Sequence, residues 1–110
     1  MKYRKKPVVI EAMQFIITEK IVCKYGVAKS INSMEICKFM GLPMMNTHTD
    51  EKGPYIVIET LEGAMRADIG DYIIKEPFPT GDRDFYPCKP DIFLMTYDEL
   101  QTKTDINLKQ

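Results

Sequence analysis

The side chains best suited to nucleophilic or metal chemistry are three cysteines and one histidine. Cys23, Cys37 and Cys88 are odd in number and lack CxxC spacing, which is typical of buried or half-buried thiols in a reducing compartment rather than of disulfides or a metal site. Cys88 is followed by Lys89, whose positive charge would lower a thiol pKa. The histidine, His48, lies in a polar segment with no sign of rigid placement, so we expect no catalytic residue, metal or cofactor. An enzyme with Cys88 as its nucleophile is the alternative interpretation.

A second group of residues could bind rather than react. The turn Gly70-Asp71-Tyr72 and the run from Phe85 to Phe93 combine tyrosine, lysine and aspartate with two prolines that would stiffen the rim of a pocket. A structural role is the alternative, because glycine allows a positive φ and aspartate can bond the backbone of a turn. The ligand-binding residues predicted by the first interpretation are Tyr72, Tyr86, Lys89, Asp91 and Arg66.

The chain opens on a basic N-terminal patch, formed by Lys2, Arg4, Lys5 and Lys6. The patch could contact phosphate, although the solvated entry to a strand is the simpler interpretation. A formal charge of −1 and a pI near 5.8 give no general attraction to nucleic acid or membrane. No apolar run reaches the ~18 residues of a membrane span, and the one behind the patch is too short for a signal peptide. We therefore expect a cytoplasmic protein whose partners are neither membranes nor nucleic acids.

Periodicity and turn residues predict the elements of the first half of the chain. Residues 7 to 15 are rich in apolar and β-branched types on both faces, as in a covered strand. Residues 16 to 31 could extend that strand, form a hairpin or form a short helix. Asn32 and Glu35 match the capping box that begins a helix, and Gly41 fits the left-handed residue that ends one. A helix of about two turns is therefore predicted between Asn32 and Gly41.

The second half predicts short antiparallel strands. A polar loop over 43–54 leads into the strongest strand, Tyr55 to Thr60, after which Leu61-Glu62-Gly63 reverses the chain. Pro90 at a first helical position opens a helix that reaches Tyr97. The remaining predicted strands are 64–67, 72–75 and 84–86. The order of these elements predicts one α+β domain over residues 1–100, in which a small curled antiparallel sheet of four or five strands packs with two short helices. A polar tail is predicted over residues 101–110.

Four stretches carry a family resemblance: Met1-Lys2-Tyr3-Arg4-Lys5-Lys6-Pro7-Val8-Val9-Ile10-Glu11-Ala12, Thr60-Leu61-Glu62-Gly63, Gly70-Asp71-Tyr72 and Phe85-Tyr86-Pro87-Cys88-Lys89-Pro90-Asp91-Ile92-Phe93. They resemble small phage and prophage proteins of the PGDYG-motif family. Residues 16 to 52 fall outside the resemblance, and the motif departs from its namesake at Ile69 and Ile73, where proline and glycine would stand. The resemblance implies a phage or prophage source and an accessory role. The family brings no agreed activity, so no catalytic residue is carried over.

These observations predict a non-enzymatic accessory protein that binds and sequesters or inhibits a host factor, with counter-defence as one such role. The factor would be a host protein or a small anionic, nucleotide-like ligand. An exposed Met/Tyr patch would favour the protein, whereas a concave site with lysine, arginine and tyrosine would favour the nucleotide. Small antiparallel sheets expose edges through which subunits pair, so we expect a homo-oligomer. A virion or assembly component is a further alternative.

Overall fold

The computed structural model describes residues 1–43 and 47–100 of the chain. In these residues the elements are, in order, β1 (Glu11–Gln14), β2 (Ile17–Cys23), β3 (Gly26–Ile31), α1 (Ser33–Met40), β4 (Thr47–Asp50), β5 (Gly53–Thr60), β6 (Gly63–Asp68), β7 (Tyr72–Lys75), β8 (Phe85–Cys88) and α2 (Pro90–Thr96). The α+β class and the two short helices are confirmed. The tail predicted over 101–110 lies outside the described residues. Within the described ranges, no helix is both long enough and apolar enough to cross a membrane.

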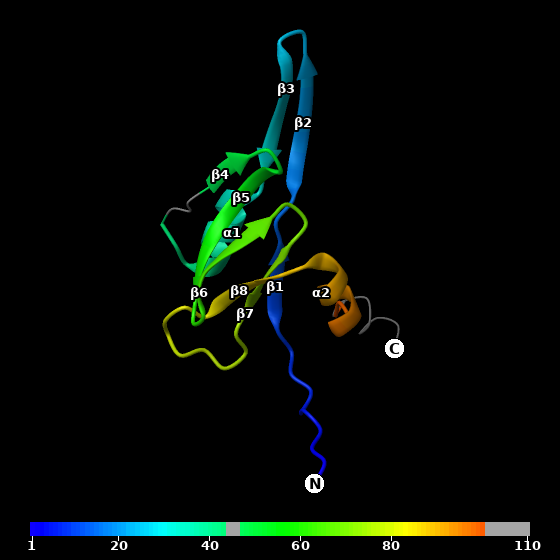
Figure 1. Cartoon of the computed structure of the whole chain (residues 1–110), viewed down its shortest axis with the longest axis vertical. Helices are drawn as coiled ribbons and strands as arrows, with labels where there is room; N and C mark the ends of the chain where they lie inside the picture. The colour runs from blue at the N-terminus through cyan, green and yellow to red at the C-terminus, as the bar shows by residue number, and fades with distance from the viewer. Residues whose placement is uncertain (44–46, 101–110) are drawn as a thin grey trace, which may run out of the picture.

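The strands form three antiparallel sheets, not the single curled sheet that the sequence predicted. Their orders are β1-β7-β8, β2-β3 and β4-β5-β6 (Figure 1). The predicted hairpin of β5 and β6 is present, with Thr60 opposite Gly63. β7 does not continue this hairpin, because the turn over 68–71 carries the chain to a place between β1 and β8. The N-terminal strand and the last strand therefore complete the sheet of β7.

The main core lies where the β1-β7-β8 sheet, the β4-β5-β6 sheet and α1 meet. Alternation along β5 points Ile56 and Ile58 into it, because side chains two apart share a face of a strand. Phe39 of α1 meets Phe85 of β8 edge-on, with 5.3 Å between ring centroids. The fully buried members of this core are Phe15, Ile36, Ile56, Ile58, Ala67 and Ile73.

α2 contacts the β1-β7-β8 sheet on the face turned away from the main core, where Phe93 meets Tyr72. Ile73 points into the core, so its neighbours Tyr72 and Ile74 point the other way. Ile74 is nevertheless buried, and the Tyr72 ring stacks on Phe93 of α2 with 3.8 Å between centroids. The sheet thus has apolar contacts on both faces, and α2 is attached to its outer one.

Two predictions of strand extent are wrong. The first strand begins at Glu11 and not at residue 7, because its partner β7 spans only four residues. The segment over 43–54, predicted as a loop, contains β4, which pairs with β5. The polar sequence of β4 suits an edge strand, whose outer side faces water. Positions 44–46 of that segment lie outside the described residues.

The capping box predicted for α1 is also wrong, although the helix forms and ends as predicted. Asn32 occupies the N-cap position without a capping hydrogen bond from its side chain. Its Nδ2 instead donates to the Gln14 carbonyl at 2.7 Å, and its Oδ1 accepts the Ile16 N–H at 2.8 Å. Tertiary contact with the end of β1 therefore replaces the local cap. Gly41 ends the helix with φ 71°, as expected for a left-handed C-terminal residue.

Residues 16–31, for which the sequence left three structures open, contain the β2-β3 hairpin. The hairpin projects beyond the rest of the molecule along its longest axis (Figure 1).

Candidate functional site

Four ion pairs join the predicted residues Arg66 and Lys89 to three aspartates. Arg66 on β6 donates from Nη1 to Asp50 at 2.5 Å and from Nε to Asp68 at 2.6 Å. Lys89, just before α2, places its Nζ 3.3 Å from Asp68 and 3.0 Å from Asp71. Asp68 accepts from both cations, so this network links β4, β6, the turn before β7 and the start of α2.

The charges of the network are internally compensated. The Arg66 guanidinium is the main reason that the pKa of Asp50 is lowered to about 2. Although desolvation by burial opposes the effect, hydrogen bonds from Arg66 and Lys89 lower the pKa of Asp68. The hydrogen bond to Asp71 is the largest cause that raises the pKa of Lys89. Three carboxylates thus surround two cations, which leaves no excess positive charge here for a small anion.

The Gly-Asp-Tyr turn is fixed to the end of β1. Gly70, with φ 100°, donates its N–H to the Phe15 carbonyl at 2.7 Å, and the Phe15 N–H returns to the Asp71 carbonyl at 2.9 Å. The Asp71 carboxylate is buried and accepts the Asp68 N–H at 2.8 Å. Gly70 and Asp71 therefore each have hydrogen-bond partners that hold the turn in its conformation. These contacts match the structural interpretation of the turn.

Both predicted tyrosines contact or neighbour α2. Tyr72 stacks almost parallel on Phe93, at an interplanar angle of 8°, and Phe93 lies 5.0 Å from the ring of Tyr97. Burial, together with the neighbouring Tyr97, raises the pKa of Tyr86 to about 12. Tyr86 also lines a cavity of about 290 Å³ beside Met65 of β6. The aromatic layer and the ion pairs act together to attach α2 to the sheet.

The exposed side of α2 is apolar, a feature that sequence reasoning missed. Met95 is 81% exposed, Leu94 is 66% exposed, and Ile92, three residues before Met95, is 51% exposed. The predicted residue Asp91 is exposed in the first turn of this helix. The sequence contains a signal for this arrangement, because Phe93 and Tyr97 are four residues apart and so lie on the same side of the helix. When that side faces the sheet, the other apolar residues of the helix face outward.

The Cys88 thiol lies in a different environment from the one that its sequence neighbour suggested. Its pKa is raised, first by burial and then by the carboxylates of Asp71 and Asp91. Lys89 turns toward Asp71 instead of activating the sulfur. His48 stacks on Tyr55, at 5.2 Å between ring centroids, and the Arg66 guanidinium lies over the ring of the same tyrosine, 3.8 Å from its centroid.

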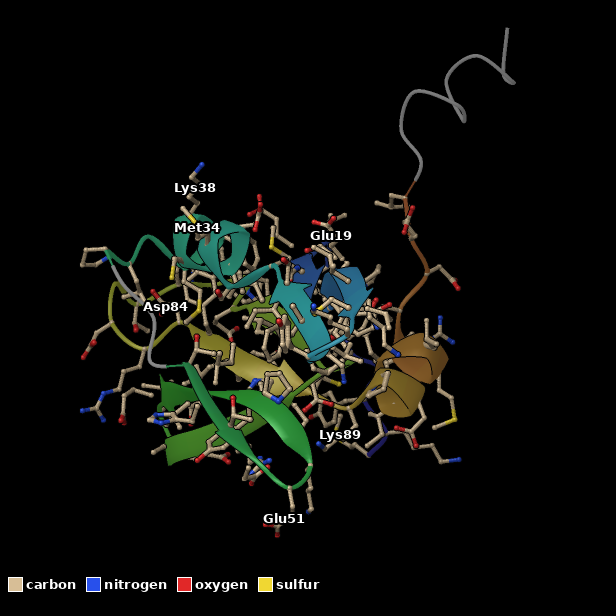
Figure 2. The ribbon with its side chains drawn as sticks, turned by 90° about the horizontal axis from the view of Figure 1, so that it is seen from above. Glu19, Met34, Lys38, Glu51, Asp84 and Lys89 are labelled. Atoms are coloured by element: carbon tan, nitrogen blue, oxygen red, sulfur yellow. The ribbon has the colours of Figure 1, made fainter. Side chains whose placement is uncertain are left out.

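The remaining predicted residues, Lys2, Arg4, Lys5 and Lys6, lie exposed in an extended segment before β1 and do not join this site. Figure 2 shows Lys89 beside α2, on the side of the molecule away from α1. Of residues 1–43 and 47–100, no group of three His, Cys, Asp or Glu side chains is placed to hold a metal ion.

The fold and site define a small α+β protein in which a network of ion pairs and stacked aromatic rings presents a short helix with an apolar outer face. No family model, curated protein or solved structure matches the chain.

Proposed function

We propose that this chain is a non-enzymatic accessory protein that captures a host protein through the outer face of α2. The observation that carries the proposal is the exposure of Ile92, Leu94 and Met95 on a helix that contacts the sheet through the Tyr72–Phe93 stack. Contiguous exposed apolar side chains are typical of surfaces that bind another protein. Capture of a host factor also fits the accessory role that the family resemblance implies.

Attachment of α2 would make binding easier. A helix of seven residues is only marginally stable by itself in water. Here stacking on Tyr72 and the Lys89–Asp71 ion pair hold it in place before any partner arrives. A helix that is already ordered loses less conformational entropy on binding, so more of the apolar contact appears as affinity.

The charges around the helix indicate the chemistry of the partner. Asp91, Asp98 and Glu99 flank the apolar residues, and the sequence from 90 to 100 contains no lysine or arginine. A partner with an apolar groove and a basic rim would complement this surface, in the manner of a helix docked in a groove. A host protein fits better than a small anion, because the carboxylates of the network already neutralise Arg66 and Lys89.

The test compares two methionines that are both exposed on helices. Tagged protein is used to isolate host proteins, and the affinity of any purified partner is then measured by calorimetry for the wild type, Met95→Lys and Met34→Lys. We expect Met95→Lys to weaken binding by at least about tenfold, or ~1.4 kcal/mol. Met34→Lys places the same charge on α1 and should leave the affinity unchanged. Equal affinities for all three chains, or a thermal shift with nucleotides and no protein partner, would contradict the proposal.

A further inference from the structure

The β2-β3 hairpin is exposed along almost its whole length. All of β2 and all of β3 except Ile31 face solvent. Val22 is 74% exposed, and Tyr25 at the tip is 87% exposed. Two-stranded hairpins are marginally stable without a further packing surface. An apolar hairpin that projects from the body therefore lacks the cover that such an element ordinarily needs.

One face of the hairpin combines apolar side chains with uncompensated positive charge. Lys20 lies directly opposite Lys29, and Val22 lies opposite Val27 two residues further along the same face. Like charges in directly opposed positions destabilise a strand pair. In residues 1–43 and 47–100 neither lysine forms an ion pair. This face would be stabilised by a partner that offers both carboxylates and apolar contact.

The chain itself supplies that chemistry, because its charges are divided unequally. Residues 1–31 contain seven Lys or Arg and two Asp or Glu, a formal charge of +5. Residues 32–110 contain eight Lys or Arg and fourteen Asp or Glu, a formal charge of −6. Within residues 1–31 the hairpin itself contains Lys20, Lys24 and Lys29 and one carboxylate, Glu19, a formal charge of +2. Two copies of the chain can therefore attract one another although the total charge is near zero.

A cavity in the acidic part matches the hairpin face. It has a volume of about 540 Å³ and lies between the end of α1, β5 and the loop before β8. Glu59 and Asp82, both exposed, lie at this cavity, and among the described residues Arg83 is the one cation in its lining. Its apolar lining residues are Met40, Leu42, Val57, Ile58 and Phe85. This volume is within the range of pockets that bury most of a small ligand, so several side chains of a hairpin can enter it.

The wall of the cavity beside Asp82 is well ordered by hydrogen bonds. The Asp84 carboxylate accepts the backbone N–H groups of Thr80 and Gly81, at 2.8 and 2.9 Å. These hydrogen bonds lower the pKa of Asp84, and the one from the Thr80 N–H has the largest effect. The carboxylate therefore stays ionised at neutral pH. Thr80 Oγ1 also donates to the Asp82 carbonyl at 3.0 Å, so the loop backbone that carries the exposed Asp82 side chain is held in place.

We propose that the hairpin of a second copy of this chain docks in this cavity. Val22 and Val27 would contact the apolar wall, while Lys20 and Lys29 approach Glu59 and Asp82. A hairpin cannot reach the cavity of its own chain, because it points away from the loop before β8 (Figure 1). Each copy carries both the β2-β3 hairpin and this cavity, so reciprocal docking of two copies would close a two-fold dimer. The α2 face takes no part in this contact and remains available to another partner.

The test uses charge reversal on each side of the contact, with molar mass measured by light scattering after size exclusion. The wild type should be a dimer whose dissociation constant rises with salt, because the contact is partly electrostatic. Lys20→Glu/Lys29→Glu retains a like-charge pair across the strands, and so should fold as well as the wild type. This variant and Glu59→Lys/Asp82→Lys should each be monomeric, with dimer affinity weakened by at least about tenfold. Mixed in equal amounts, the two variants should form a heterodimer with one charge-reversed contact.

Matched controls separate this contact from general charge effects. Lys5→Glu/Lys6→Glu makes the same change in net charge on the N-terminal segment and should remain dimeric, as should Met95→Lys. A thermal melt of each variant reports whether it folds. A monomeric wild type, or a dimer that survives Lys20→Glu/Lys29→Glu, overturns the proposal. The proposal is also overturned if the wild type is monomeric and binds duplex DNA while Lys20→Glu/Lys29→Glu does not bind it. The hairpin would then contact nucleic acid and not a second copy of the chain.

Discussion

The Nζ atom of Lys89 lies 3.0 Å from Oδ2 of Asp71, a residue whose side chain is only 4% exposed. The lysine supplies the positive charge that this buried carboxylate needs, and the Asp68 N–H supplies a second hydrogen bond at 2.8 Å. Because Lys89 immediately precedes α2, the same contact fixes the first turn of the helix to the turn before β7. The residue that the sequence indicated as a ligand contact therefore has a structural contact of its own.

We expect Lys89→Met to reduce the free energy of unfolding by about 1–2 kcal/mol, because it leaves a buried carboxylate without its counter-charge. Urea denaturation followed by circular dichroism measures the change. Adding Asp71→Asn to Lys89→Met removes the buried charge and should restore part of the loss. Lys38→Met, on the exposed side of α1, is the matched control and should differ little from the wild type. A loss of the same size in Lys38→Met would show that the Lys89–Asp71 contact contributes nothing.

Stability should fall in acid because of the carboxylates bound to Arg66. The pKa of Asp50 falls from 3.8 to about 2 on folding, and that of Asp68 is also lowered. Groups with a lowered folded pKa stabilise the fold above their unfolded pKa, and this contribution is lost as the pH falls through the folded value. The melting temperature should therefore decrease between about pH 4 and about pH 2. Arg66→Gln should flatten this part of the curve, and an unchanged slope would contradict the assignment.

Local patterns predicted the elements whose determinants are close in sequence. The reversal at Leu61-Glu62-Gly63 joins two strands that pair directly, and Pro90 begins α2 as expected. Gly41 likewise ends α1. In each case the conformational preference of one or two residues decides the outcome.

Partners distant in sequence could not be predicted in this way. β1 pairs with β7, and their residues are about sixty positions apart. The single predicted sheet was wrong because alternation along a strand indicates a buried face but not which strand lies beside it. The candidate site shows the same limit: the run from Phe85 to Phe93 contains Lys89, but the contacts that Lys89 and Tyr72 make depend on Asp71 and Phe93.

Asn32 shows how tertiary contact overrides a local pattern, and it leads to a quantitative prediction. Its side chain satisfies the Gln14 carbonyl and the Ile16 N–H, two backbone groups beside the core. Asn32→Ala should lower the free energy of unfolding by about 2–3 kcal/mol, since both groups lose a partner. Asn32→Asp keeps only the acceptor and should also destabilise the protein. If the capping box were present instead, Glu35→Ala would be the costly change; here it should be nearly neutral in the same urea titration.

The reactivity of Cys88 provides a test of the enzymatic alternative. Because burial and two carboxylates raise its pKa, little thiolate is present at neutral pH, and thiolate is the species that attacks an electrophile. Cys23 is exposed and should be alkylated first by iodoacetamide, with Cys88 labelled slowly at neutral pH and faster as the pH rises. Mass spectrometry of digested protein follows each site separately, and labelling in urea gives the reference rates of the unfolded chain. Faster labelling of Cys88 than of Cys23 in the folded protein would indicate an activated nucleophile and would favour an enzyme over a binding protein.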